Sequence, residues 1–290
     1  MIALTEYDRI TSVVVKHVRD GFVDDRTIAA QWKALNYPAP PDLVRAIDEC
    51  DRFIDILRST GATVHQLPRN LGTTLDSIYV RDASIVSKSG LILCSMGKAE
   101  RATEPGAQAQ ALEKVDVAIS GRIEPPGRLE GGDLIWIDER TIAVGRGYRT
   151  NPEGIRQLRE RVGDDVDVVE VPLPHWRGQG DVMHLMSLIS PLDRDLALVY
   201  SRLLPVPFRE WLLERGMTLI EVPDEEFETM GTNVLALAPR RCLMLSGNPL
   251  TRRALERSAC EVLEYEGSEI SVKGAGGPTC LTRPLSRSRN

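Results

Sequence analysis

The sequence predicts an α/β fold in which five similar ββαβ modules form a ring around a central pocket. Three observations lead to this prediction. Helix signals that begin near a proline occur five times, a short apolar run follows each helix, and a polar residue recurs at nearly constant intervals. Because strands that alternate with helices imply βαβ units, and regular repetition implies a repeat architecture, the pattern favours a closed ring.

The five helices are predicted where proline stands near the start, because proline lacks the N–H that the first helical turn leaves unpaired. Three of them end at or near a glycine, which often terminates a helix. The helical segments are 40–61, 105–115, 151–163, 205–217 and 248–260. The apolar runs that follow, each predicted to be a strand, are 62–67, 115–120, 166–171, 218–222 and 261–265.

A loop and a compact hairpin are expected after each of these strands. Turn residues place four hairpin turns at Ser89-Gly90, Asp138–Arg140, Pro191–Arg194 and Pro239-Arg240. The fifth hairpin is split between the two ends of the chain, with one strand in 11–18 and its partner in 279–285. Pairing of these two strands would close the ring.

Five polar residues mark equivalent positions in the predicted modules. Each lies at or near the start of a hairpin, and the intervals between them are 51, 51, 49 and 47 residues: Asp82, Asp133, His184, Asn233 and Cys280. In a ring these positions converge on the axis, and the shared pocket is the predicted active site. Two alternatives stay open, because a doubly wound open sheet also alternates strands with helices, and polar residues at strand entrances are common turn formers.

The length and composition are those of a soluble globular enzyme. With 290 residues the chain can bury a substantial core, and we expect one catalytic domain over 1–290, in which 1–40 includes a loop that could act as a lid. No apolar run approaches the roughly 20 residues of a membrane span. Glu6 and Asp8 stand where a signal peptide would be basic and apolar. We therefore expect a cytoplasmic protein with no membrane partner.

The charge and the cysteines argue against further classes. A formal net charge of −6 disfavours a nucleic-acid partner, because phosphate contacts need a basic face, and it is compatible with a small cationic ligand. The five cysteines are scattered and include no CxxC pair, which argues against a disulfide framework and a thiolate zinc site.

Cys280 and His184 are the residues most suited to covalent chemistry. The segment KGAGGPTC gives Cys280 a glycine-rich approach, which lets the backbone pass close to a ligand. His184, in VMHLMS, could be a core histidine, but near Cys280 it would supply the partner that a nucleophilic thiol needs. The remaining cysteines are interpreted as small buried apolar residues: Cys50, Cys94, Cys242 and Cys260.

Two acidic segments could complete this site. RLEGGDLIW supplies Glu130 and Asp133, and an acid beside a histidine fixes its tautomer and supports its charged form. Asp76 and Asp82 stand six residues apart in LDSIYVRDAS, on one face of a regular strand. Without a lysine nearby, two such carboxylates would suit a planar cation. The alternative is a solvated strand end in which Arg81 pairs locally.

Two arginines lie just beyond predicted inner strands. Arg101 and Arg149 are ordinary surface residues by composition, but each could reach over the ring and hold a carboxylate.

Taken together, DSIYVRD, LEGGDLIW…GYRTNPEG, VMHLMS and GGPTC resemble motifs of the guanidino-modifying enzymes, most closely the dimethylarginine dimethylaminohydrolases. The similarity keeps the same order over about residues 60–285 and leaves 20–41 uncovered. It implies the five-bladed β/α-propeller, or pentein, fold. It also implies hydrolysis of arginine or an Nω-substituted arginine, such as methylated arginine, to a urea-type product such as citrulline plus ammonia or an amine.

The resemblance also implies roles for individual residues. Cys280 would be the nucleophile, His184 the general acid and base, and Glu130 the acid that completes the triad. The implied substrate-binding residues are Asp76, Asp82 at the guanidinium, and Arg101 and Arg149 at an amino-acid carboxylate. No metal or organic cofactor is implied, and the only partner expected is the small guanidino substrate.

Two residues depart from the family patterns. Arg81 stands where the hydrolases have an acid, as in arginine deiminases and amidinotransferases, and it could add to the affinity for an anionic substrate group. Those two families, however, place an aspartate where this chain has Met186. The identity of the substrate is therefore left open by the sequence.

Three alternatives to a dimethylarginine hydrolase remain at this point. They are an arginine deiminase, an amidinotransferase in which an amine replaces water, and a non-enzymatic pentein resembling a translation-initiation and ribosome-assembly factor. The joint presence of a cysteine, a histidine and acids favours an enzyme. Apolar segments such as 203–213 could serve a homodimer contact.

Overall fold

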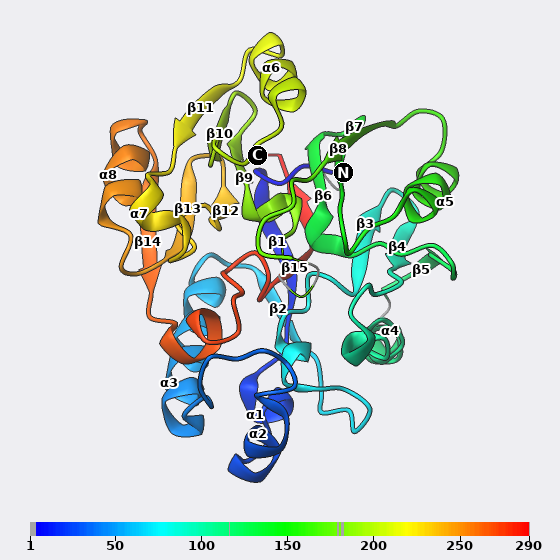
Figure 1. Cartoon of the computed structure of the whole chain (residues 1–290), viewed down its shortest axis with the longest axis vertical. Coiled ribbons are helices and arrows are strands. Elements are labelled where there is room, and N and C mark those ends of the chain that lie inside the picture. The colour runs from blue at the N-terminus through cyan, green and yellow to red at the C-terminus, as the bar shows by residue number, and fades with distance from the viewer. Residues whose placement is uncertain (1–3, 116, 179, 181–182, 290) are drawn as a thin grey trace.

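The computed structural model describes residues 4–115, 117–178, 180 and 183–289, and they form five three-stranded sheets around a common centre (Figure 1). In every sheet the middle strand pairs antiparallel with one neighbour and parallel with the other. The sheets, each in spatial order, are β15 (Arg283–Ser288), β1 (Arg9–Val15) and β2 (Thr63–Gln66); β3 (Ser84–Ser87), β4 (Gly90–Leu93) and β5 (Ile119–Arg122); β6 (Leu134–Asp138), β7 (Thr141–Arg146) and β8 (Asp167–Pro172); β11 (Thr218–Glu221), β10 (Leu196–Val199) and β9 (Ile189–Asp193); and β12 (Leu235–Ala238), β13 (Arg241–Leu245) and β14 (Glu261–Tyr265).

A helix links the middle strand of each sheet to the parallel strand beside it, and these helices lie around the outside of the ring (Figure 1). They are α3 (Leu43–Ser59), α4 (Glu104–Leu112), α5 (Pro152–Val162), α6 (Val206–Glu214) and α8 (Pro249–Arg257). The helices outside this repeat are α1 (Val18–Gly21), α2 (Asp25–Gln31) and α7 (Asp224–Phe227). Short helical turns occur at η1 (Leu75–Ile78), η2 (Ala99–Arg101), η3 (Glu113–Val115), η4 (Gly131–Asp133), η5 (Leu185–Ser187) and η6 (Ser268–Val272).

The fivefold prediction from the sequence is confirmed, including the module that is split between the two ends of the chain. β1 pairs antiparallel with β15, with Val13 opposite Pro284, and β2 follows on the other side of β1. The helices begin where the proline signals predicted them, and Asn151 caps α5 by accepting a hydrogen bond from the backbone N–H of Gly154. Among the described residues, no helix has the length and apolar character needed to cross a membrane.

Three local predictions are corrected. Asp76 does not lie on a strand shared with Asp82, because the backbone N–H and the hydroxyl of Ser77 bond to the carbonyl of Thr74 and close a 3₁₀ turn instead. Strand β5 begins at Ile119, later than predicted. The N-terminal stretch expected to be loop-like contains α2, which Asp24 caps through the backbone N–H of Thr27.

The entrances of three hairpins meet at the axis of the ring. A Cβ atom on Gly132 would lie 2.5 Å from Nδ1 of His184 and 2.7 Å from Oδ1 of Asp82. Residues at three equivalent module positions are therefore packed as closely as a glycine permits. The predicted convergence of Asp82, Asp133 and His184 is confirmed by this contact.

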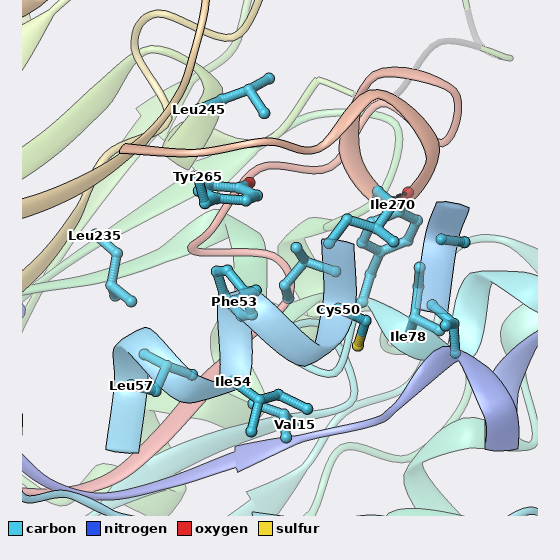
Figure 2. Close-up of a cluster of buried hydrophobic side chains, with 14 of the residues drawn as sticks. Val15, Cys50, Phe53, Ile54, Leu57, Ile78, Leu235, Leu245, Tyr265 and Ile270 are labelled. Carbon is cyan, nitrogen blue, oxygen red and sulfur yellow. Dashed lines mark hydrogen bonds between the residues drawn. The ribbon is translucent and has the colours of Figure 1, made fainter. Parts of the chain in front are cut away.

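The longest helix, α3, anchors the wall next to this centre (Figure 2). Its apolar face carries Cys50, Phe53, Ile54 and Leu57, which are spaced three or four residues apart and are buried. Figure 2 shows these side chains facing residues from several strands and from η6. The Phe53 ring lies 4.9 Å from the ring of Tyr265, between centroids. This packing holds η6 in place, and the chain runs from η6 to Cys280.

We expect Phe53→Ala to lower the free energy of unfolding by about 3–5 kcal/mol, because it removes a buried ring and leaves a cavity in the core. Val44→Ala on the same helix is the matched control, since Val44 is 78% exposed, and it should change that free energy by less than about 0.5 kcal/mol. Urea denaturation followed by circular dichroism measures both. Equal losses in the two variants would contradict the assignment of this helix face to the core.

Candidate active site

A pocket of about 120 Å³ opens at the axis of the ring and brings together most of the residues predicted for the site. Its lining includes Asp76, Asp82, Arg101, Arg149, His184 and Cys280. A neighbouring cavity of about 150 Å³ is also lined by His184 and Cys280. The thiol and the imidazole, which are 96 residues apart in the sequence, therefore lie on the same two cavities.

His184 and Glu130 form the central pair of the site. Nε2 of His184 lies 2.7 Å from Oε2 of Glu130, and both side chains are buried. The other oxygen of Glu130 accepts hydrogen bonds from the backbone N–H groups of Gly97, at 2.8 Å, and Lys98, at 3.2 Å. With Nε2 engaged by Glu130, the second ring nitrogen, Nδ1, faces Asp82 at 3.7 Å.

The surrounding carboxylates keep His184 protonated. Burial alone would lower the pKa of His184, but the charges of Asp82, Asp133 and Glu130, together with the hydrogen bond from Glu130, outweigh burial and raise the pKa to about 9. Burial alone would raise the pKa of Glu130, but the hydrogen bond to His184 and its charge lower that pKa well below its ordinary range. At neutral pH the pair is an imidazolium and a carboxylate.

Asp133 supports this pair from below the pocket. Its carboxylate accepts hydrogen bonds from the hydroxyl of Thr150, at 2.6 Å, and from the backbone N–H of Leu185, at 3.0 Å. Burial raises the pKa of Asp133 to about 6, although the charge of His184 opposes this. Asp133 therefore ties η4 to η5 and fixes the backbone on which His184 sits.

Asp82 has one oxygen bound and one oxygen exposed to the centre of the site. Its Oδ2 accepts a hydrogen bond of 2.6 Å from Nη1 of Arg101. Its Oδ1 is buried and has no hydrogen-bond partner among the described residues. A buried carboxylate oxygen without a partner is costly, and it is therefore a natural site for a bound cation.

Arg101 is held more tightly than the sequence suggested. It donates to both oxygens of Glu104, to Oδ2 of Asp82 and to the carbonyl of Tyr79, at distances of 2.6–2.9 Å. Four of its five N–H groups are used in this way. Arg101 therefore orients Asp82, and only one N–H remains for a ligand. Arg149 lies on the same pocket, with Nη1 at 3.4 Å from Oε1 of Glu130.

Asp76 reaches the pocket, but it is already paired. The ammonium of Lys98 donates to Oδ2 of Asp76 at 2.6 Å and to the carbonyl of Leu35 at 3.3 Å. The expectation that no lysine covers Asp76 is therefore wrong. Lys98 is also a pocket residue that sequence reasoning missed, although its position three residues before Arg101 in GKAER was a usable signal.

Arg81 does not face the pocket, and this corrects its predicted role. Its side chain is 1% exposed and points to the other side of the ring, where Nη1 lies 3.2 Å from Oε2 of Glu6. Its Nε donates to the carbonyl of Thr279 at 3.0 Å. The Arg81 guanidinium is therefore unavailable to a ligand in the active-site pocket.

Cys280 lies in a small polar setting within the buried centre. The side-chain amide of Asn233 donates to its sulfur at 3.4 Å, and the hydroxyl of Thr279 lies 3.9 Å from the sulfur. Burial and the charge of Asp82 raise the pKa of the Cys280 thiol, although these hydrogen bonds oppose the rise. The thiol is therefore neutral in the empty pocket at neutral pH. Asn233, the fourth of the recurring residues, is a sulfur partner that the sequence placed correctly without assigning a role.

Asp82, Glu130 and His184 offer atoms within 4.8 Å of one another, a spacing that could also suit a metal ion. The same lone pairs are used by the contact between His184 and Glu130 and by the bond from Arg101 to Asp82. This use of the ligand atoms favours proton transfer over metal binding.

The comparisons with known proteins agree with this geometry. The family model for eukaryotic N,N dimethylarginine dimethylhydrolases matches residues 31–287. An N(G),N(G)-dimethylarginine dimethylaminohydrolase from Streptomyces coelicolor is 30% identical over 241 residues, which cover 82% of this chain and 84% of that protein. An arginine deiminase from Mycobacterium tuberculosis is 27% identical over 249 residues, covering 72% of this chain and 60% of the deiminase.

Solved structures share the fold at lower sequence identity. The DDAH from Pseudomonas aeruginosa complexed with citrulline has a TM-score of 0.73 and 21% identity, covering 94% of this chain and 98% of that chain. An amidinotransferase from Microseira wollei has a TM-score of 0.77 and 16% identity, covering 100% and 98%. Because the family model spans most of the sequence, the chain belongs to the dimethylarginine dimethylaminohydrolase family, within the guanidino-modifying pentein enzymes.

Proposed function

We propose that this protein hydrolyses an Nω-alkylated arginine to citrulline and an alkylamine through a covalent intermediate on Cys280. The observation that carries the proposal is the imidazolium of His184, held by Glu130 on the same pocket as Cys280 and facing the unpartnered oxygen of Asp82. Family membership favours an enzyme over a non-enzymatic pentein.

Substrate binding follows from the charges in the pocket. The guanidinium of the substrate would donate to Oδ1 of Asp82, which satisfies this buried oxygen. The carboxylate of the amino acid would bind Arg149 and the remaining N–H of Arg101. Leu35, Asn36 and Tyr37 line the same pocket, so they would contact the bound substrate. The role of the preceding segment as a lid stays a prediction.

In the first half of the reaction, the bound cation lowers the pKa of the Cys280 thiol, and the thiol proton passes to solvent. The thiolate attacks the central guanidinium carbon, and a C–S bond forms. Nδ1 of His184 then donates its proton to the departing amine as the C–N bond breaks, because Nε2 stays bound to Glu130. An amidino-thioether on Cys280 remains.

In the second half, neutral His184 accepts a proton at Nδ1 from a water molecule that attacks the same carbon. The C–S bond breaks, the thiolate leaves, and citrulline is released. Every proton lost by the imidazolium in the first half is therefore recovered in the second. The Asn233 amide, 3.4 Å from the sulfur, would stabilise the thiolate each time it forms.

The second cavity favours an alkylated leaving group. It meets Cys280 and His184 and has a largely apolar wall made by Trp176, Met183, Met186, Phe227 and Met230. Methyl groups on the departing nitrogen would be buried there, and each buried CH₂-sized group contributes about 0.8 kcal/mol. Deiminases and amidinotransferases have an aspartate in place of Met186, which suits a nitrogen that carries hydrogens.

Replacement of either proposed reacting residue should stop or slow turnover while leaving the fold intact. We expect Cys280→Ser to form no measurable citrulline, and His184→Ala to lower kcat by about a hundred- to ten-thousand-fold, the usual contribution of acid–base catalysis. Citrulline release from Nω,Nω-dimethylarginine measures both. Cys242→Ser is the matched control, because Cys242 is buried away from the pocket. Normal turnover by His184→Ala would refute the assignment.

The charged state of His184 can be measured directly. In a Cys280→Ser background, an NMR titration should give His184 a pKa of about 9, above the ordinary value of 6.5, because nearby carboxylates stabilise the imidazolium. The raised pKa means that the proton stays bound up to a higher pH. Glu130→Gln should lower this pKa, whereas Glu124→Gln on the surface should not. A pKa that Glu130→Gln leaves unchanged would contradict the proposed pairing.

Substrate preference tests the alkylated leaving group. We expect kcat/KM to favour Nω,Nω-dimethylarginine over arginine by about 10–200-fold, the range that burial of small apolar groups provides. Met186→Asp should reverse or remove this preference, and Met186→Leu should keep it, because only the aspartate introduces an acceptor for N–H groups. A wild-type protein that prefers arginine would instead be a deiminase.

A further inference from the structure

We propose that a monatomic anion, chloride in a cellular setting, binds among three buried arginines on the side of the ring opposite the active-site pocket. The arginines are Arg81, Arg283 and Arg287, with 1%, 3% and 4% of their surface exposed. They line a cavity of about 20 Å³ together with residues that precede β1. The proposal does not depend on which guanidino substrate the enzyme takes.

The first support is a set of unsatisfied donors. Nη2 of Arg81, Nε of Arg283 and Nη2 of Arg287 are buried and have no hydrogen-bond partner among the described residues. Arg283 and Arg287 lie four residues apart on β15, so their side chains leave the same face of the strand. Buried polar groups nearly always have a partner, and three orphaned guanidinium donors around one cavity call for an acceptor there.

The bonds that these arginines do make go mostly to neutral groups. Arg283 donates to the carbonyl of Arg81 at 2.5 Å, and Arg287 donates to the carbonyls of Asp8 and Ala236 at 2.5 Å and 2.8 Å. These bonds fix the direction of the guanidinium groups. They do not neutralise the charge.

The second support is the excess of positive charge. Only Glu6 contributes a carboxylate that is hydrogen-bonded to the cluster, through Arg81. The carboxylate of Asp8 is instead bonded to the hydroxyl of Thr5 and lies 3.8 Å from Arg289. Three guanidinium groups therefore face one carboxylate in a buried setting, where uncompensated charge is strongly unfavourable.

The pKa values of two members of the cluster reflect this environment. Burial lowers the pKa of Arg283 to about 9, and the charge of Arg81 lowers it further in the same direction. Burial lowers the pKa of Arg287 to about 10. Both groups therefore remain cationic at neutral pH, so the excess charge is present when the enzyme works.

The size and the walls of the cavity restrict the ligand. A space of about 20 Å³ admits a single particle of roughly the size of water, so phosphate and sulfate are too large. Part of its wall is apolar, from Leu4, Val86, Trp136 and Pro284. A halide fits this combination, because it is monatomic, weakly hydrated and able to accept several N–H donors at once.

An anion here would brace the segment that carries the nucleophile. The backbone N–H of Arg81 donates to the carbonyl of Cys280 at 3.2 Å, and Nε of Arg81 donates to the carbonyl of Thr279 at 3.0 Å. An ion that holds the Arg81 guanidinium would therefore restrain these two carbonyls from behind. This is a supporting role, and the ion takes no part in the chemistry.

The experiment compares sodium chloride with sodium gluconate at constant ionic strength, because gluconate is too large for the cavity. We expect the Tm of the wild type to rise with chloride, by roughly 4 °C when chloride reaches a hundred times its dissociation constant. Arg287→Gln should lose most of this shift, because it removes one of the three orphaned donors. Arg289→Gln is the matched control and should keep it, since the Arg289 side chain is 55% exposed.

Crystals grown with sodium bromide give an independent readout, which also covers the case in which Arg287→Gln does not fold. The expected result is an anomalous bromide peak in contact with the free nitrogens of Arg81, Arg283 and Arg287. A wild-type Tm that responds equally to chloride and gluconate, a shift retained by Arg287→Gln, or a water molecule in place of the bromide would overturn the proposal.

Discussion

The hydrogen bond between Glu130 and His184 is the interaction on which the rest of the site depends. It begins a row of buried side chains whose charges alternate in sign, from Glu130 to His184, Asp82, Arg101 and Glu104. Each member has a neighbour of opposite charge, which offsets part of the unfavourable loss of water. Because the row crosses from one module to the next, it also fixes the relative positions of the hairpin entrances.

This balance of charge bears on how the nucleophile is activated. The acidic groups of the pocket already have basic partners, including the pairs of Asp76 with Lys98 and of Asp82 with Arg101. A substrate guanidinium adds one positive charge to a dry, nearly balanced site. Ionisation of Cys280 restores the balance, so the thiolate becomes favourable only when the cation is present. The empty enzyme thus keeps its cysteine in the less reactive thiol form.

The sequence was sufficient for the arrangement of the modules, because each module announces itself locally through a proline-initiated helix, an apolar run and a turn. It also placed Asp82, His184 and Cys280 together, since ring symmetry brings equivalent positions to one axis. It failed for Arg81 and for the pairing of Asp76 with Lys98. Both depend on the direction that a side chain takes after a short helical turn, and the alternation of a regular strand does not describe that direction.

The pairing of β1 with β15 has a consequence for how the enzyme matures. The other four sheets form from stretches that are close in sequence, whereas this sheet joins Val13 to Pro284. Contacts between such distant residues form late, because their entropy of closure is large. On the ribosome, the histidine and its acids can therefore be assembled well before the nucleophile is locked beside them. Hydrolytic competence would be acquired in one of the last steps of biogenesis.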